Sequence, residues 1–190
     1  MWHRRSYRYK VAVPFQETPT DAQILQDTTH YRVFEVAGNM SSARASYFHK
    51  SLGGYHAAKP KRIQQLFDYQ IAKNNKNVLD MLNIKYIIQS DEKGQEFATI
   101  NPDANGNAWF VSKIEYVNSA DEEMKALDKL NTKEVATLNL FEFGAWRKGN
   151  NNPNSFSKDS LATIKLDLYK PNHLKYTSNN TNDGFAVFSE

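Results

Sequence analysis

The spacing of apolar side chains predicts strands in the first two thirds of the chain. Residues 31–36 alternate between apolar and polar positions and are rich in β-branched and aromatic side chains, which is typical of a strand. Residues 84–88 form a short apolar run, and residues 109–116 and 134–140 carry similar patterns. These four segments are expected to form a mixed β-sheet.

A period of 3.6 residues predicts a helix that begins at Pro60. Proline suits the first turn of a helix, where its missing N–H would have no partner in any case. Four apolar residues follow at helical spacing on one face: Ile63, Leu66, Phe67 and Ile71. We expect this stripe to pack on the sheet that contains Val33 and Ile87.

Small and polar residues divide the chain into segments. Residues 1–30 read as an irregular lead-in, in which residues 21–26 can form one helical turn, and residues 31–143 read as an α/β subdomain. Residues 144–160 are rich in Gly, Asn, Ser and Pro, which predicts a linker. Residues 161–190 alternate in three runs separated by turn residues, which predicts an antiparallel β-meander. The open edge at the last run predicts that the meander is truncated there.

The predicted fold class is α+β, with a mixed β-sheet flanked by two or three helices. An antiparallel β-meander follows it and would begin a β-sandwich-like subdomain. Besides the helix from Pro60, short helices are predicted at residues 78–82 and 119–127. The second opens with Ser119, and Glu122 three residues later completes a capping box.

Composition excludes several classes of site. The 190 residues carry a net charge of +3, too small by itself to indicate nucleic acid or anionic lipid as a partner. The absence of cysteine excludes disulfides, thiolate metal sites and cysteine nucleophiles. No Gly-x-Ser-x-Gly elbow or phosphate-binding loop occurs, so we predict no catalytic residue and no cofactor.

The distribution of charge draws attention to one loop. No acidic residue lies between Val36 and Phe67, although this stretch contains five Lys and Arg residues. Within it, residues 46–56 read SYFHKSLGGYH, and the two adjacent glycines permit backbone geometry closed to other residues. The aromatic rings, imidazoles and cations of this stretch are suited to contact an anion or a sugar. The candidate ligand-binding residues are His49, Lys50, Tyr55, His56 and Lys59.

Two interpretations of this loop stay open, a ligand site and a constrained loop that packs on the sheet. In the first, Tyr47, Phe48 and Tyr55 hold the loop by burial while the cationic and imidazole side chains point outward. The two histidines, His49 and His56, have no carboxylate near them in the sequence, so no metal site is predicted.

Seven segments resemble the YfhO family of bacterial membrane proteins, in the form found in Bacteroidetes. In chain order they read PTDAQILQD (19–27), YRVF (31–34), SYFHKSLGGYHAAK (46–59), VLDMLNIKYI (78–87), NGNAWFV (105–111), YKPNHLKY (169–176) and DGFAVFSE (183–190). The resemblance covers about residues 18–190. Residues 1–17 and the Asn-rich linker do not share it.

The resemblance implies a soluble accessory domain on the extracytoplasmic, periplasmic face of the inner membrane. The parent would be a multi-pass protein similar to C-type glycosyltransferases, which modify cell-envelope polymers with sugar from a polyprenyl-phosphate carrier. The catalytic acid of that architecture lies in a loop between early membrane helices that this chain does not contain. The implied partners are the membrane-embedded part of the same protein, a cell-envelope glycan and the lipid-linked sugar.

Two alternatives come from other classes of protein. A stand-alone carbohydrate-binding module would need exposed aromatic side chains on one face. A basic nucleic-acid-binding protein would use residues 44–62, and an extracytoplasmic location would exclude it. Nucleic acid is therefore not among the predicted partners.

Overall fold

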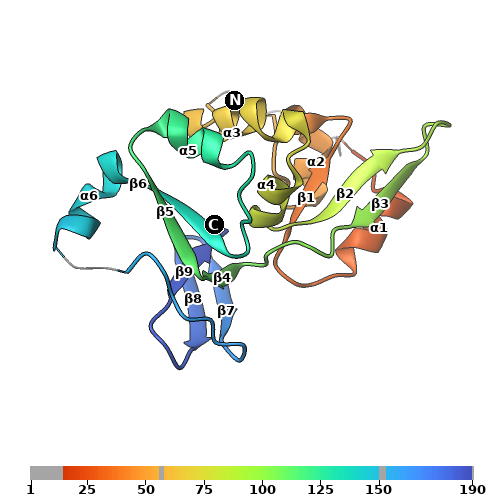
Figure 1. Ribbon diagram of the computed structural model, residues 1–190. Helices are drawn as coiled ribbons and strands as arrows, with labels where there is room; N and C mark the ends of the chain where they lie inside the picture. The colour runs from red at the N-terminus through yellow and green to blue at the C-terminus, as the bar shows by residue number, and fades with distance from the viewer. Residues whose placement is uncertain (1–14, 56–57, 150–152, 190) are drawn as a thin grey trace, which may run out of the picture.

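The computed structural model of the chain describes residues 15–55, 58–149 and 153–189, and the backbone alone for residues 145–149. It confirms the α+β fold class, because short helices and small parallel and antiparallel sheets are mixed along the chain (Figure 1). A mixed sheet is present and has three strands in the order β1-β2-β3. The expectation that residues 109–116 and 134–140 belong to this sheet is wrong, because their strands lie in two other sheets.

The first sheet joins strands that are distant in sequence. Strand β1 (Arg32–Glu35) pairs in parallel with β2 (Ile84–Ser90), and β3 (Glu96–Ile100) returns antiparallel to β2. Because β1 and β2 are parallel, a long crossover must connect them. It contains a series of short helices: η1 (Asn39–Ser41), α2 (Ala43–Phe48), α3 (Lys61–Tyr69), η2 (Ile71–Lys73) and α4 (Lys76–Met81).

Neighbouring residues of β1 supply the cores on the two sides of this sheet, since successive side chains of a strand point to opposite faces. Val33 packs with Ile24 of helix α1 (Pro19–Leu25) and with Ile88. Phe34 packs in a second cluster that contains Ile71, Val78 and Ile84, with α3 and α4 covering it. The sheet is therefore the middle layer between α1 and the crossover helices.

A second β-α-β unit follows. Strand β5 (Lys113–Val117) pairs in parallel with β6 (Val135–Asn139), and helix α5 (Ala120–Ala126) connects them. The Ser119 hydroxyl accepts the Glu122 N–H at the start of α5, whereas the Glu122 carboxylate accepts from Asn118 N–H rather than closing the box on Ser119. Helix α6 (Leu140–Gly149) follows β6 directly, and α5 lies beside α3 in Figure 1.

The predicted meander is correct for two strands and wrong for the third. Strands β7 (Thr163–Lys170) and β8 (His173–Asn179) form the expected hairpin, which projects from the body in Figure 1. Strand β9 (Phe185–Phe188) pairs with β4 (Ala108–Val111) instead of β8. A Cβ atom at Gly184 would lie 3.1 Å from the Phe110 ring, so glycine there permits the close approach of β4.

Four other differences concern segments that were expected to be largely irregular. The lead-in contains α1, which begins with Thr18 and Asp21 capping each other. Helix α2 occupies part of the Gly-rich loop, and α6 extends into the expected linker. Strand β3 was not predicted, although Phe97 to Ile100 follow a turn at Gly94.

The apolar stripe of α3 is only partly covered. Ile71, just after the helix, is buried as expected, and Leu66 and Phe67 pack in part against the Phe34 cluster. Ile63 is 36% exposed. The prediction that the whole stripe packs on the sheet is therefore wrong at its N-terminal end, where the side chains face a cavity instead.

We predict a large loss of stability for Ile84→Ala and a small one for Ile100→Ala. Ile84 is fully buried at the start of β2, whereas Ile100 is 57% exposed at the end of β3. The first change should lower the free energy of unfolding by about 2–5 kcal/mol, and the second by about 1 kcal/mol or less. Urea unfolding of both variants measures this, and equal losses would contradict the assigned core.

Candidate functional site

The loop singled out by the sequence directs one of its histidines inward. The side chain of His49 is 1% exposed, and its Nε2 lies 2.9 Å from Oδ1 of the buried Asp21. The expectation that His49 points outward is therefore wrong. So is the expected burial of the rings of Tyr47 and Tyr55, which are 51% and 84% exposed.

Asp21 collects several donors around one buried carboxylate. Thr18 donates through its backbone N–H and its hydroxyl, and Arg44 Nη2 forms an ion pair with the same oxygen. Burial by itself raises the pKa of Asp21, but the hydrogen bonds from Thr18 and His49 and the charge of Arg44 outweigh it and lower this pKa overall. Arg44 also lies 3.7 Å from Glu35 and 3.4 Å from Glu96.

This arrangement corrects a second expectation. The stretch from Val36 to Phe67 lacks acids in sequence, yet Asp21, Glu35 and Glu96 come from other elements and neutralise Arg44. The cluster joins α1, β1, α2 and β3. We therefore interpret His49 and Arg44 as groups that hold the fold together.

The other candidate residues of the loop do not converge on one point. Lys50 Nζ lies 3.9 Å from the centre of the Tyr169 ring, which also stacks on His30. Lys59 Nζ donates to the backbone oxygen of Met40, 2.5 Å away. Tyr55 is exposed, and His56 lies outside the described residues. Lys50 and Lys59 are thus tied to different parts of the fold.

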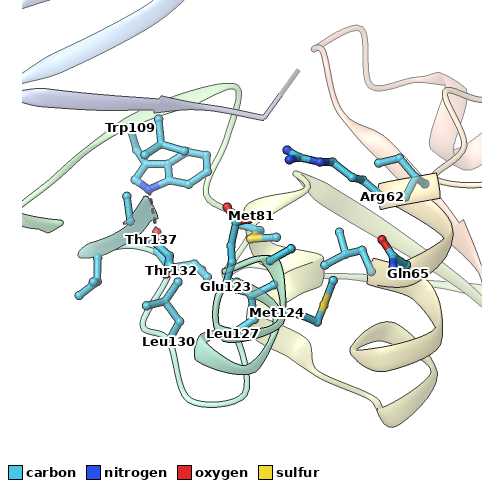
Figure 2. A pocket seen from close by; sticks show the side chains of 16 residues that line it. Arg62, Gln65, Met81, Trp109, Glu123, Met124, Leu127, Leu130, Thr132 and Thr137 are labelled. Carbon is cyan, nitrogen blue, oxygen red and sulfur yellow. Dashed lines mark hydrogen bonds between the residues drawn. The ribbon is translucent and has the colours of Figure 1, made fainter. Parts of the chain in front are cut away.

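A cavity of about 340 Å³ lies where α3 and α5 face each other (Figure 2). Its walls are mainly apolar and come from α3, α4, α5, β4, β6 and β9. The apolar lining residues are Ile63, Leu66, Met81, Trp109, Ala120, Met124, Leu127, Leu130, Val135, Ala136 and Val187. The volume is in the range of small-molecule sites. Two methionines in the wall can adapt to different apolar shapes because their side chains are unbranched and flexible.

Polar groups of the cavity wall are mostly engaged with the protein. Trp109 Nε1 donates to the backbone oxygen of Thr132 at 2.8 Å, which fixes the indole ring at one side of the cavity. The Thr132 hydroxyl donates to Asn77 O. Thr137 also lines the cavity, and its buried hydroxyl has no hydrogen-bond partner among the described residues. This hydroxyl is shielded from solvent, so it does not offer a hydrogen bond to an occupant of the open cavity.

Charged residues stand at the edge of the cavity. Arg62 of α3 forms an ion pair with Glu142 of α6, and this hydrogen bond raises the pKa of Arg62. Glu123 of α5 lies close enough to contribute to the same shift. Figure 2 shows Arg62 and Glu123 on the two helices that flank the apolar walls.

A second cavity, of about 600 Å³, lies on the other side of β4 toward the hairpin. Its lining combines Trp109, Phe110 and Phe156 with Lys133, Lys158 and Asp159. Two of these charges are engaged: Lys158 pairs with Glu134 at 2.5 Å, and Asp159 accepts from Thr181. This cavity is the more polar of the two.

Comparison of the chain with protein-family models, with curated proteins and with solved structures found no match. Within the described ranges, no helix is long and apolar enough to cross a membrane. The same residues contain no group of three or more His, Cys, Asp or Glu side chains that could hold a metal ion.

The α3–α5 cavity is the feature that sequence reasoning missed. Its parts were visible, since Ile63 and Leu66 were placed on one stripe and Met124 falls in a predicted helix. Nothing local indicates that α5, about sixty residues later in the chain, covers this stripe incompletely. One part of the Asp21 cluster could have been predicted from the sequence, because Thr18 and Asp21 have the spacing of a capping box.

We predict that Asp21→Asn destabilises the fold by about 3–5 kcal/mol at pH 7, because Arg44 and the buried His49 lose the carboxylate that they share. Since the folded pKa of Asp21 is lowered, its contribution is complete above the unfolded value of about 4 and is lost as pH falls through the folded pKa. The difference between wild type and variant should therefore shrink in acid.

Urea unfolding at pH 7 and at successively lower pH measures both effects. Asp103→Asn is the matched control, since Asp103 also has a lowered pKa but is exposed and pairs with Lys76 at the surface. It should cost much less than Asp21→Asn. A variant as stable as wild type at pH 7 would show that the Asp21 cluster does not support the fold.

Proposed function

We propose that this chain is an extracytoplasmic accessory domain of a YfhO-like membrane protein, and that it acts by binding. The site of binding is the α3–α5 cavity, which holds the apolar part of a partner molecule. The observation that carries the binding role is the cavity itself, with apolar walls and an adaptable pair of methionines.

Four aspartates with lowered pKa values are engaged in contacts within the fold. The pKa values of Asp21, Asp27, Asp103 and Asp159 are all lowered, although burial alone would raise those of Asp21 and Asp27. Hydrogen bonds and ion pairs to neighbouring side chains and backbone lower them. A general acid at neutral pH needs the opposite shift, so these groups suit structural roles.

The family resemblance supplies the setting for this proposal. The parent would be a multi-pass glycosyltransferase-like protein that modifies cell-envelope polymers from a polyprenyl-phosphate sugar, with its catalytic residues in the membrane-embedded part. That part is the proposed main partner of the domain. The domain would shield the membrane active site or help to present the acceptor glycan.

One observation favours an alternative, a carbohydrate-binding module. The second cavity combines three aromatic side chains with lysines and hydroxyls, and rings with polar groups around them suit sugar binding. A soluble envelope glycan that binds to wild type and to Met124→Ala, but not to Phe156→Ala, would favour this alternative. Of these two cavities, Met124 lines the first and not the second, and Phe156 lines the second and not the first.

We predict that, of two reporters inserted in this domain, only the one that works outside the cytoplasm is active. Gly94 lies in the exposed turn between β2 and β3, which suits an insertion. In cells that express the complete gene, alkaline phosphatase at this position should be active, and green fluorescent protein exported in unfolded form should be dark. The reverse pair of results would contradict the proposed location.

A further inference from the structure

We propose that the α3–α5 cavity selects an amphiphilic cation, a molecule with an aliphatic tail and an ammonium or guanidinium head. This inference rests on the proposed function, because it names the chemistry of the partner that the cavity binds. It adds a preference for the charge of the head group, which the binding role alone does not require.

The preference for an aliphatic tail follows from the apolar walls of the cavity. Met81, Met124, Leu66 and Leu127 surround the space with unbranched or branched aliphatic side chains, and the Trp109 ring closes one side (Figure 2). Burial of apolar surface contributes about 25 cal/mol for each Å² removed from water. A cavity of about 340 Å³ is at the small end of ligand sites, so it fits one short chain or one ring rather than a long lipid.

The sign of the head group follows from the charges at the edge. Arg62 is the one cation among the residues that line the cavity, and Glu142 of α6 already forms an ion pair with it. Glu123 is the one acid of the lining, and it forms no ion pair among the described residues. Arg62, Glu142 and Glu123 together leave one negative charge at the opening.

The surroundings of Glu123 do not cancel this charge. Asp121 and Glu122 precede it in the first turn of α5, and both are acidic. Lys125 in the last turn of α5 lines a neighbouring hollow that shares Gln65 and Met124 with the cavity, and Asp121 and Asp128 line that hollow beside it. Glu123 is also half-buried beside apolar walls, where water screens a charge less than in the open. An ammonium head beside it would therefore gain more than at a free surface.

The test uses three molecules with the same tail and different heads: octylammonium, octan-1-ol and octanoate. Isothermal titration calorimetry of the full chain at fixed ionic strength should give the order octylammonium, octan-1-ol, octanoate from tightest to weakest. We expect about a five-fold advantage of octylammonium over octan-1-ol. Glu123→Gln, which keeps the shape and removes the charge, should abolish this advantage and leave octan-1-ol binding unchanged.

Glu122→Gln is the matched control. It removes the same charge from the preceding residue of α5, which does not line the cavity. The preference for octylammonium should persist in it. The amphiphilic cation could be part of a protein partner or a small amine. A blocked peptide with two leucines and one lysine, added to the series, distinguishes them. Binding tighter than that of octylammonium would indicate a protein partner, and weaker binding a small amine.

The outcomes separate this inference from the proposed function. If all three probes bind equally, the preference for a cation is overturned and the binding role stands. If none binds, or if binding persists in both Ala136→Leu and Ala120→Leu, the cavity is not the binding site and both proposals fail. Ala136 lies in a wall and Ala120 at the exposed edge, so at least one obstruction is expected to fold, which thermal unfolding checks.

Discussion

The carboxylate of Asp21 has no contact with water, and a buried carboxylate keeps its charge only where hydrogen bonds and a counter-charge replace the solvent. Thr18, Arg44 and His49 provide both, and they come from the start of α1, from α2 and from its C-cap. Meeting this one requirement fixes α1 against the sheet and brings the Gly-rich loop back over β1. The backbone of this loop also pairs with β1, since Val33 exchanges hydrogen bonds with Lys50 and Leu52.

As a result of the same packing, other elements cover the apolar face of α3 only in part. The crossover must return from β1 to the start of β2, and η2 and α4 occupy the space over Phe34 and Ile84. The N-terminal half of α3 therefore extends beyond the first sheet. Ile63 and Leu66 meet α5, which belongs to a different β-α-β unit. Two helices that are each positioned by their own sheet need not pack closely, and the cavity lies between them.

Much of the fold could be predicted from local pattern. Residues 31–36, 84–88 and 134–140 alternate or run apolar, and each of these segments contains a strand of the structure. The two strands of the hairpin were predicted as well because alternation is strict there. Strand β3 left a usable signal, a turn at Gly94 followed by alternating Phe97 and Thr99, so its absence from the prediction reflects a missed pattern.

What could not be predicted depends on contacts between distant residues. The sequence around Gly184 is that of a hairpin turn, but β9 pairs with β4, and a side chain at Gly184 would meet both Asn180 and Phe110. His49 reads as an exposed loop residue, and its partner Asp21 is 28 positions away. The α3–α5 cavity has the same origin, because its walls come from α3, β4, α5, β6 and β9. Local periodicity predicts which face of a helix is apolar, but not whether another element covers it completely.

The position of the cavity has a thermodynamic consequence for any occupant. Ile63 and Leu66 belong to the crossover of the first sheet, whereas Met124 and Leu127 belong to the unit of β5 and β6. A molecule that contacts all four would bury apolar surface on both units at once. Because it binds the arrangement in which α3 and α5 face each other, it also stabilises that arrangement by mass action. The Arg62–Glu142 ion pair also joins the edge of the cavity to α6, since the same guanidinium lines the cavity and contacts the helix that follows β6. Occupancy of the cavity and the packing of the two units are therefore linked through the residues that form its walls.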